Sequence, residues 1–263
     1  MTLIIALVCK DAVVLAADTQ ATEVQGGMNP ATMVRHSTSK IHLLGKSMAW
    51  AGSGTVSVLQ DIETALDGWQ GRQGNQPLKA IKTLRGELVK LVSPTQKEAY
   101  SHWVPVPAAA NLPPNTSALF AGYSDNRPWI MEISENGMGE VKTGFAAIGG
   151  AYHLASVAHA MVQHYSGPDL SMVNGQLLTL RVLETAVQAA GFGVAEPLHV
   201  ATIDASGARL LSEDDVRGLR DQVQAWKQSE SEVLLSIAGV PPAALVPDQT
   251  TSGERPAEAP ESA

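Results

Sequence analysis

The sequence of 263 residues is poor in cysteine, in aromatic residues and in positive charge. Its one cysteine, Cys9, cannot form an internal disulfide, which excludes a disulfide-stabilised scaffold of the secreted type. The 18 Lys and Arg residues stand against 26 Asp and Glu residues, for a formal net charge of -8. Nucleic-acid-binding proteins normally carry a basic face, so this composition argues against a nucleic-acid partner. We expect Cys9 to be a small core residue of a reduced, cytoplasmic protein.

Long hydrophobic runs are also missing. No stretch reaches the roughly 18 uninterrupted apolar residues of a membrane span. The apolar residues at the start of the chain are interrupted early by Asp11 and Asp18, unlike those of a secretory signal. We therefore expect no membrane partner. A hydrophobic content of 44% with 17% charged residues is typical of a soluble globular protein.

Three short patterns fall short of cofactor or metal motifs. Gly45-Lys46-Ser47 ends like a phosphate-binding loop, but Lys40 stands where that motif has its first glycine. The segment Gly52-Ser53-Gly54 lacks the third glycine of a dinucleotide-binding fingerprint. Three histidines of one predicted helix lack the spacing that would place two of them on one metal ion: His153, His159 and His164. The sequence therefore predicts no cofactor and no metal site.

Apolar runs and helical periodicities alternate along the chain. Two hairpins are predicted first, at residues 2–9 with 12–17 and at residues 41–45 with 47–52, and later strands are predicted at 117–123, 127–133, 140–150, 198–204 and 208–211. Four apolar stripes recur at helical spacing: Val56, Leu59, Ile62, Leu66 and Trp69; Leu78, Ile81, Leu84, Leu88 and Leu91; Leu154, Val157, Ala158, Met161 and Tyr165; Leu177, Leu180, Leu183 and Val187. Residues 19–39 and 101–115 are predicted to be irregular.

This order of elements predicts an α+β fold. Grouped strands with antiparallel turns and paired helices favour a four-layer αββα sandwich of two antiparallel sheets between helix layers, rather than a parallel βαβ sheet. We predict one domain over residues 1–231, which ends in a charged helix at 212–231. Residues 232–263 form a tail rich in Pro, Glu and Ala, a composition typical of disorder.

Thr2 directly follows the start methionine at the head of the first predicted strand. A hydroxyl becomes a nucleophile only when a base lies close by, and an N-terminal threonine carries such a base in its own α-amine. That amine has a reference pKa of about 7.7 to 8.0, well matched to neutral pH. Removal of Met1 therefore makes Thr2 a candidate nucleophile. The alternative is an ordinary β-branched strand residue.

The residues after Thr2 carry a denser pattern. Lys10 to Asp18 reads KDAVVLAAD, Ala21-Thr22 and Lys40-Ile41-His42 follow, and Ala49 to Gly54 reads AWAGSG. With Asp18 sixteen residues after Thr2, this pattern resembles the β-type subunits of the 20S proteasome and their bacterial proteasome-like relatives, which are N-terminal-nucleophile hydrolases. The resemblance is dense over residues 2–58 and continues beyond them mainly as element order.

The resemblance implies a threonine-type endopeptidase. It makes Thr2 the nucleophile, with its own amine as the base, and makes Lys40 a cation that lowers the pKa of the hydroxyl while a salt bridge to Asp18 holds it in place. The amide of Gly52 becomes the oxyanion donor, and Thr22 and Gly52 line a groove for an extended, unfolded peptide. It further implies a homo-oligomeric, self-compartmentalised ring in the cytoplasm, fed by an ATP-dependent unfoldase.

The chain departs from the family pattern in several places. Residues 147–152 lack a serine, and residues 191–197 lack both the aspartate and the serine that support the amine of the nucleophile in the family. Gln20 stands where the family commonly has arginine, and the stretch between Asp18 and Lys40 is longer. Two alternatives therefore stay open: a catalytically degenerate shell or assembly subunit, and an amidase of small amides.

Overall fold

The computed structural model describes residues 2–24, 33–73, 79–102, 115–165, 167, 169–190 and 195–238, without the side chains of 21–24, 33–37 and 71–73. The chain divides into two compact units, Met1–Val223 and Gln224–Ala263. The first unit contains both large sheets and the helices that cover them. Within the described residues, no helix combines the length and the apolar character needed to cross a membrane.

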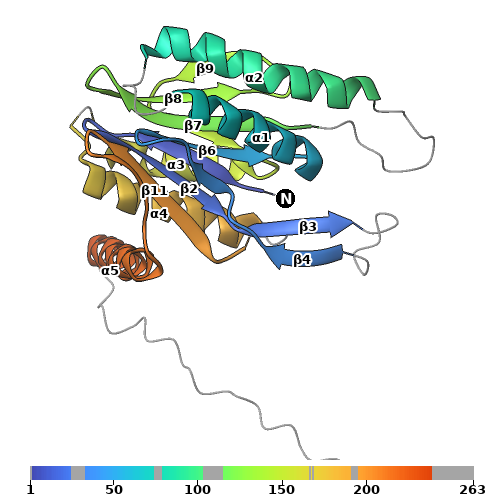
Figure 1. Ribbon diagram of the computed structural model, residues 1–263. Helices are drawn as coiled ribbons and strands as arrows, with labels where there is room; N and C mark the ends of the chain where they lie inside the picture. Colours follow the sequence, from blue (N-terminus) through green and yellow to red (C-terminus); the bar gives the residue numbers. More distant parts are fainter. Residues whose placement is uncertain are drawn as a thin grey trace, which may run out of the picture. The chain divides into compact units, whose positions relative to one another are not determined.

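Two five-stranded antiparallel sheets form the centre of the first unit (Figure 1). The first has the order β10-β1-β2-β11-β12 and consists of β1 (Ile4–Val8), β2 (Ala12–Asp18), β10 (Phe145–Ile148), β11 (Leu198–Asp204) and β12 (Gly207–Leu210). The second has the order β5-β6-β7-β8-β9 and consists of β5 (Ile41–Leu43), β6 (Met48–Ser53), β7 (Ser117–Ser124), β8 (Arg127–Ile133) and β9 (Gly139–Lys142). Both predicted N-terminal hairpins are confirmed, as β1 with β2 and as β5 with β6.

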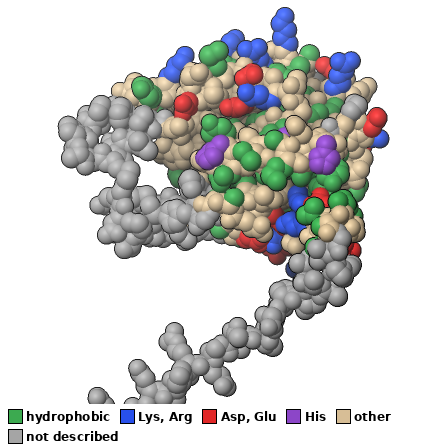
Figure 2. Space-filling view, turned by 180° about the vertical axis from the view of Figure 1, so that it is seen from behind, with side chains coloured by type: hydrophobic (Ala, Val, Ile, Leu, Met, Phe, Trp, Pro, Cys, Tyr) green, Lys and Arg blue, Asp and Glu red, His purple; other side chains and the backbone are tan. Residues whose placement is uncertain are grey.

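Helices cover the outer faces of both sheets (Figure 1). Helices α1 (Val56–Gln73) and α2 (Ile81–His102) lie on the second sheet, and α3 (Tyr152–Val162) and α4 (Met172–Ala190) lie on the first. The short helix η2 (Gln163–Tyr165) directly follows α3. The predicted α+β sandwich is therefore confirmed. Helix α2 carries four exposed basic side chains: Lys82, Arg85, Lys90 and Lys97. Figure 2 shows Lys and Arg side chains gathered along the upper edge of the molecule.

The inner core between the sheets explains why the first hairpin is so apolar. Every residue of β2 is buried, because one face of the strand packs against the second sheet and the other packs against α4. A strand covered on both faces reads as a continuous apolar run rather than an alternating one. The one charged residue of this strand, Asp18, stands at its end and is fully buried.

The segment between Asp18 and Lys40 was predicted to be irregular, and this prediction was wrong. Strands β3 (Gln20–Val24) and β4 (Met33–Ser37) pair as a two-stranded antiparallel ribbon that projects beyond the two sheets (Figure 1). The sequences QATEV and MVRHS contain few apolar residues, so they lack the alternation by which a half-buried strand is recognised.

Residues 140–150 were predicted as one strand, but they form two strands in different sheets. β9 pairs with β8 in the second sheet, whereas β10 pairs with β1 in the first. The chain crosses between the sheets at Thr143-Gly144, where Gly144 has a φ of +78°. Glycine adopts this left-handed conformation without steric cost, which permits the abrupt change of direction.

Two helices differ from their predicted form. In α3 the buried residues are Ala155, Ala158 and Val162, while Val157 and Met161 of the predicted apolar stripe are 61% and 71% exposed. Small side chains thus form the face toward the sheet. The C-terminal helix α5 (Glu213–Ile237) continues beyond residue 231, so residues 232–237 of the predicted tail are helical. Residues 239–263 lie outside the described part of the chain.

Cys9 is a core residue, as predicted, and its surroundings yield a stability test. It is 2% exposed, and burial raises the pKa of its thiol to about 12. Its Sγ would lie 2.2 Å from a Cβ added to Gly175 of α4. We therefore expect Gly175→Ala to destabilise the protein by about 1–3 kcal/mol through overpacking. The free energy of unfolding from urea titration measures this cost.

Two further variants separate overpacking from helix propensity. A Cβ at Gly86, in the exposed face of α2, meets nothing within 4 Å. Gly86→Ala should therefore stabilise the protein by roughly 0.5–1 kcal/mol. Adding Cys9→Ala to Gly175→Ala removes the clashing sulfur and should recover most of the loss. If the double variant is no more stable than Gly175→Ala, contact with Cys9 is not the cause.

Candidate active site

Asp18 is the centre of a buried polar cluster at the end of β2. Its Oδ1 accepts hydrogen bonds from the Leu3 backbone N–H at 2.8 Å and from Lys40 Nζ at 2.7 Å, and its Oδ2 accepts one from the Gln20 N–H at 3.1 Å. Leu3 directly precedes β1, Gln20 begins β3 and Lys40 directly precedes β5. One carboxylate therefore fixes the relative positions of three chain segments.

Burial dominates the ionisation of this pair. Side chains of Asp18 and Lys40 are 0% and 7% exposed. Burial raises the pKa of the Asp18 carboxyl and lowers the pKa of the Lys40 ammonium, because it penalises the charged form of each. Their ion pair and the backbone N–H donors to Asp18 oppose these shifts. Among the described residues, neither side chain has a second ion-pair partner, so each charge depends on the other.

Thr2 is anchored through its own backbone. The peptide that joins it to Leu3 donates the Leu3 N–H to Asp18, and its carbonyl oxygen faces Gly149. A Cβ added to Gly149 would lie only 2.1 Å from that oxygen. Gly149 follows β10 and has a φ of +102°, a conformation that L-residues rarely adopt. The Thr2–Leu3 peptide is therefore held between a carboxylate and a glycine.

Gly52 lies near the end of β6, opposite Ala118 of β7. A Cβ added to Gly52 would meet Leu59 Cδ2 of α1 at 2.3 Å. The absence of a side chain thus allows α1 to pack closely over the end of this strand. Gly52 also contributes to the wall of a cavity.

Thr2, Lys40 and Gly52 line one open cavity of about 1020 Å³. Residues from the first sheet and its following turn form one wall, and residues from the second sheet and α1 form the other. Asp18 lies behind Lys40 and does not line the cavity. The backbone of Thr22 pairs with Arg35 in the ribbon, but its side chain lies outside the described atoms. The structure therefore brings together three of the residues selected from the sequence and places a fourth in contact with Lys40.

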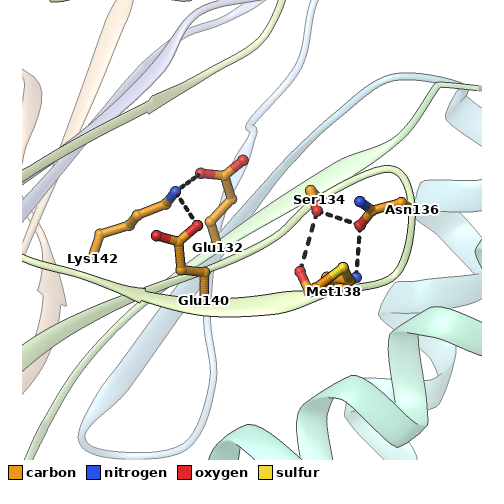
Figure 3. Close-up of polar contacts among 6 residues, drawn as sticks. All are labelled: Glu132, Ser134, Asn136, Met138, Glu140 and Lys142. Atoms are coloured by element: carbon orange, nitrogen blue, oxygen red, sulfur yellow. Dashed lines mark hydrogen bonds and ion pairs between the residues drawn. The ribbon is translucent and has the colours of Figure 1, made fainter.

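The part of the cavity wall formed by β8 and β9 carries a cluster of charged side chains (Figure 3). Lys142 Nζ lies 2.7 Å from a carboxylate oxygen of Glu140 and 3.2 Å from one of Glu132. Hydrogen bonds to these carboxylates raise the pKa of Lys142, so its charge is balanced on both sides. Ser134, which also lines the cavity, bonds to Asn136 and Met138 in the adjoining turn.

Sequence reasoning missed several residues of this cavity. It treated residues 147–152 as a turn that lacks a serine, whereas the structure places Gly149 of that turn against Thr2. Ser53 also lines the cavity, with its hydroxyl 3.2 Å from the Cβ position of Gly149. The signal available in the sequence was the pair Gly149-Gly150, which directly follows an apolar strand. Residues 191–194 of the second turn lie outside the described part.

The described residues offer no metal-binding cluster of three or more His, Cys, Asp or Glu side chains. The polar groups at the site are a hydroxyl, an ammonium, a buried carboxylate and backbone amides. Such a set matches the requirements of acyl transfer, in which a nucleophile, a nearby positive charge and an oxyanion donor converge on one carbonyl.

Comparison with known proteins gives a distant similarity over most of the chain. No protein-family model matches the chain. The chain is 25% identical over 220 residues to "Proteasome subunit beta 1" of Thermococcus sibiricus (strain DSM 12597 / MM 739), a match that covers 82% of this chain and 92% of that protein. Two antiparallel five-stranded sheets with their helices are consistent with a proteasome-like sandwich. Similarity along most of both chains supports a proteasome-like family for this protein.

Proposed function

We propose that the protein is a threonine-type peptidase in which Thr2 becomes the N-terminal nucleophile after Met1 is removed. The observation that carries the proposal is the shared cavity: Thr2, Lys40 and Gly52 line it together, and buried Asp18 holds Lys40. The similarity to a protein named as a proteasome β subunit supports a proteasome-like role. An unpaired lysine at this depth would be costly, so the buried carboxylate gives the cation a stable place beside the cavity.

The proposed reaction uses groups of the chain alone. The α-amine of Thr2 takes the hydroxyl proton as the Thr2 oxygen attacks the substrate carbonyl, and the positive charge of Lys40 lowers the pKa of that hydroxyl. The Gly52 N–H donates to the developing oxyanion. The protonated amine then passes its proton to the leaving amine of the substrate, which leaves an ester on Thr2. Water hydrolyses this ester and regenerates the free hydroxyl.

The wider setting of this activity is also proposed. An extended, unfolded peptide fits an open cavity between sheet ends, and Thr22 with Gly52 would border its path as a strand. By analogy with the proteasome subunit that the chain resembles, we propose a homo-oligomeric ring in the cytoplasm that an ATP-dependent unfoldase feeds. Sedimentation of the purified protein at a mass of many subunits would support the ring and would argue against a small-amide amidase.

Intact mass spectrometry with a peptide electrophile tests the catalytic proposal. The reagent should be one that reacts jointly with a hydroxyl and the adjacent free amine, such as a peptide epoxyketone. We expect the full-length protein to lack Met1 and to gain one reagent mass on Thr2. Thr2→Ala should form no adduct, whereas Thr64→Ala, on the exposed face of α1, should react fully. Retention of Met1, or absence of the adduct, would instead favour a non-catalytic shell subunit.

A further inference from the structure

His42 and Glu63 form a pair on the wall of the candidate active-site cavity, and the proposed chemistry uses neither. His42 Nδ1 lies 2.9 Å from Glu63 Oε1, and both residues line the same cavity as Thr2. Their side chains are 32% and 42% exposed, so a molecule in the cavity can reach them. The sequence places them 21 residues apart on different elements, and only the fold brings them together.

Strand pairing places this pair close to the proposed oxyanion donor. His42 of β5 lies directly opposite Trp50 of β6, and Trp50 shares a face of β6 with Gly52. Two residues along a strand span about 7 Å, which is within the reach of one substrate side chain. Glu63 approaches the same face from α1, whose neighbouring residue Ile62 packs in one cluster with Trp50.

The two side chains of the pair offer hydrogen-bond acceptors. A neutral imidazole keeps one ring nitrogen as an acceptor, and an ionised Glu63 carboxylate only accepts hydrogen bonds. No other described residue has a recorded hydrogen bond or ion pair with either side chain. The ring of His42 stacks on Trp50, with centroids 5.0 Å apart and planes at 23°, which restrains the plane of the imidazole.

Glu63 brings a negative charge to this part of the cavity. Lys40 is balanced by Asp18, and Lys142 lies between two carboxylates (Figure 3). Glu63 and Glu135 line the cavity without a Lys or Arg partner among the described residues. A carboxylate without a Lys or Arg partner, beside a ring nitrogen that can accept, matches a group that carries only donors, and the guanidinium of arginine is such a group.

We propose that the His42–Glu63 pair selects peptides with an arginine side chain next to the bond that is cleaved. This inference rests on the proposed function, because it assigns a substrate class to the same cavity. Glu63 supplies the charge and one acceptor, and His42 supplies the second acceptor. A neutral side chain of the same length leaves that charge without a partner and binds more weakly.

Binding of two matched peptides tests the inference separately from catalysis. Full-length Thr2→Ala protein is titrated into fluorescent peptides that are identical except for arginine or its neutral isostere citrulline, and anisotropy gives the Kd. We expect arginine to bind about tenfold more tightly, as for a hydrogen-bonded charge. In Glu63→Gln this preference should fall to about twofold or less. Asp67→Asn makes the same change of charge on the exposed face of α1 and should keep the full preference.

Three outcomes overturn the inference: no measurable binding of either peptide, no preference for arginine, or a preference that Glu63→Gln leaves intact. The electrophile adduct on Thr2 tests the proposed function independently of this binding experiment. An adduct without arginine preference removes the inference and leaves the peptidase proposal standing. A Glu63-dependent preference for arginine without an adduct supports the pair as a recognition site and removes the threonine chemistry.

Discussion

Replacing Lys40 by methionine should lower Thr2-dependent peptide hydrolysis by at least about 100-fold, the scale of losing one electrostatic group at a reacting centre. It should also lower the free energy of unfolding by about 3–5 kcal/mol, because Asp18 is left buried without its counterion. Hydrolysis of a fluorogenic peptide and urea titration measure the two effects. Methionine retains most of the length of lysine, so lost packing contributes little to either result.

A matched control exists in a second ion pair of the same length. Lys79 Nζ lies 2.7 Å from Glu87, as Lys40 does from Asp18, but the side chains of that pair are 39% and 29% exposed. Lys79→Met should therefore cost less than about 1 kcal/mol. Equal losses in Lys40→Met and Lys79→Met would contradict the special cost of the buried carboxylate.

A double variant separates the structural role of Lys40 from its catalytic role. Asp18→Asn with Lys40→Met leaves no buried charge, and the amide oxygen of asparagine can still accept the Leu3 N–H. We expect the double variant to recover most of the lost stability and none of the lost hydrolysis. If hydrolysis returns together with stability, the proposed effect of Lys40 on the Thr2 hydroxyl is wrong.

The stability of Lys40→Met should depend on pH, because the pKa of the Asp18 carboxyl is raised in the native state. Burial already raises the pKa of this carboxyl above its ordinary value of 3.8, and removing Lys40 removes a charge that lowers it. In the native variant, the Asp18 carboxyl keeps its proton at a pH at which the unfolded chain has already released it. The stability of the variant therefore falls as the pH rises from the Asp18 pKa of the unfolded chain to that of the native state. The stability deficit against the wild type should accordingly shrink as the pH is lowered from about 7 towards 4.

The parts of the fold that were predictable are those with a strong burial pattern. Strands β1 and β2 are apolar throughout because both of their faces are covered, and this pattern is visible in the sequence alone. The ribbon of β3 and β4 was missed because its pairing leaves no apolar alternation to detect. In α3 the periodicity was real but its buried face was misassigned, since Ala155 and Ala158, not the larger residues, pack inward.

The candidate site likewise contains residues that the sequence predicted and contacts that it did not predict. Asp18 and Lys40 were selected through a sequence resemblance, and the structure brings them within 2.7 Å of each other. The contact between Gly149 and Thr2 depends on how β10 ends beside β1, and the His42–Glu63 pair depends on how α1 packs over β5 and β6. Such contacts arise from tertiary packing of separate elements, so no local pattern in the chain predicts them.

Gly149→Ala should reduce hydrolysis by at least about 100-fold, because misplacing a reacting group by about 1 Å has an effect of this size. The new Cβ would stand 2.1 Å from the Thr2 carbonyl oxygen and 2.7 Å from its carbon, so the Thr2–Leu3 peptide has to move. That movement also pulls the Leu3 N–H away from Asp18, which loosens the attachment of the nucleophile. The rate of adduct formation on Thr2, measured by mass spectrometry, reports the loss directly.

Gly144→Ala is the control that isolates this contact from backbone strain. Gly144 and Gly149 flank the same strand, β10, and both have positive φ angles, of +78° and +102°. A Cβ at Gly144 meets nothing within 4 Å. Backbone strain should therefore lower the free energy of unfolding by about 1–2 kcal/mol in both variants, but only Gly149→Ala displaces Thr2. Similar rates of adduct formation in the two variants would mean that the contact between Gly149 and the Thr2 carbonyl does not position the nucleophile.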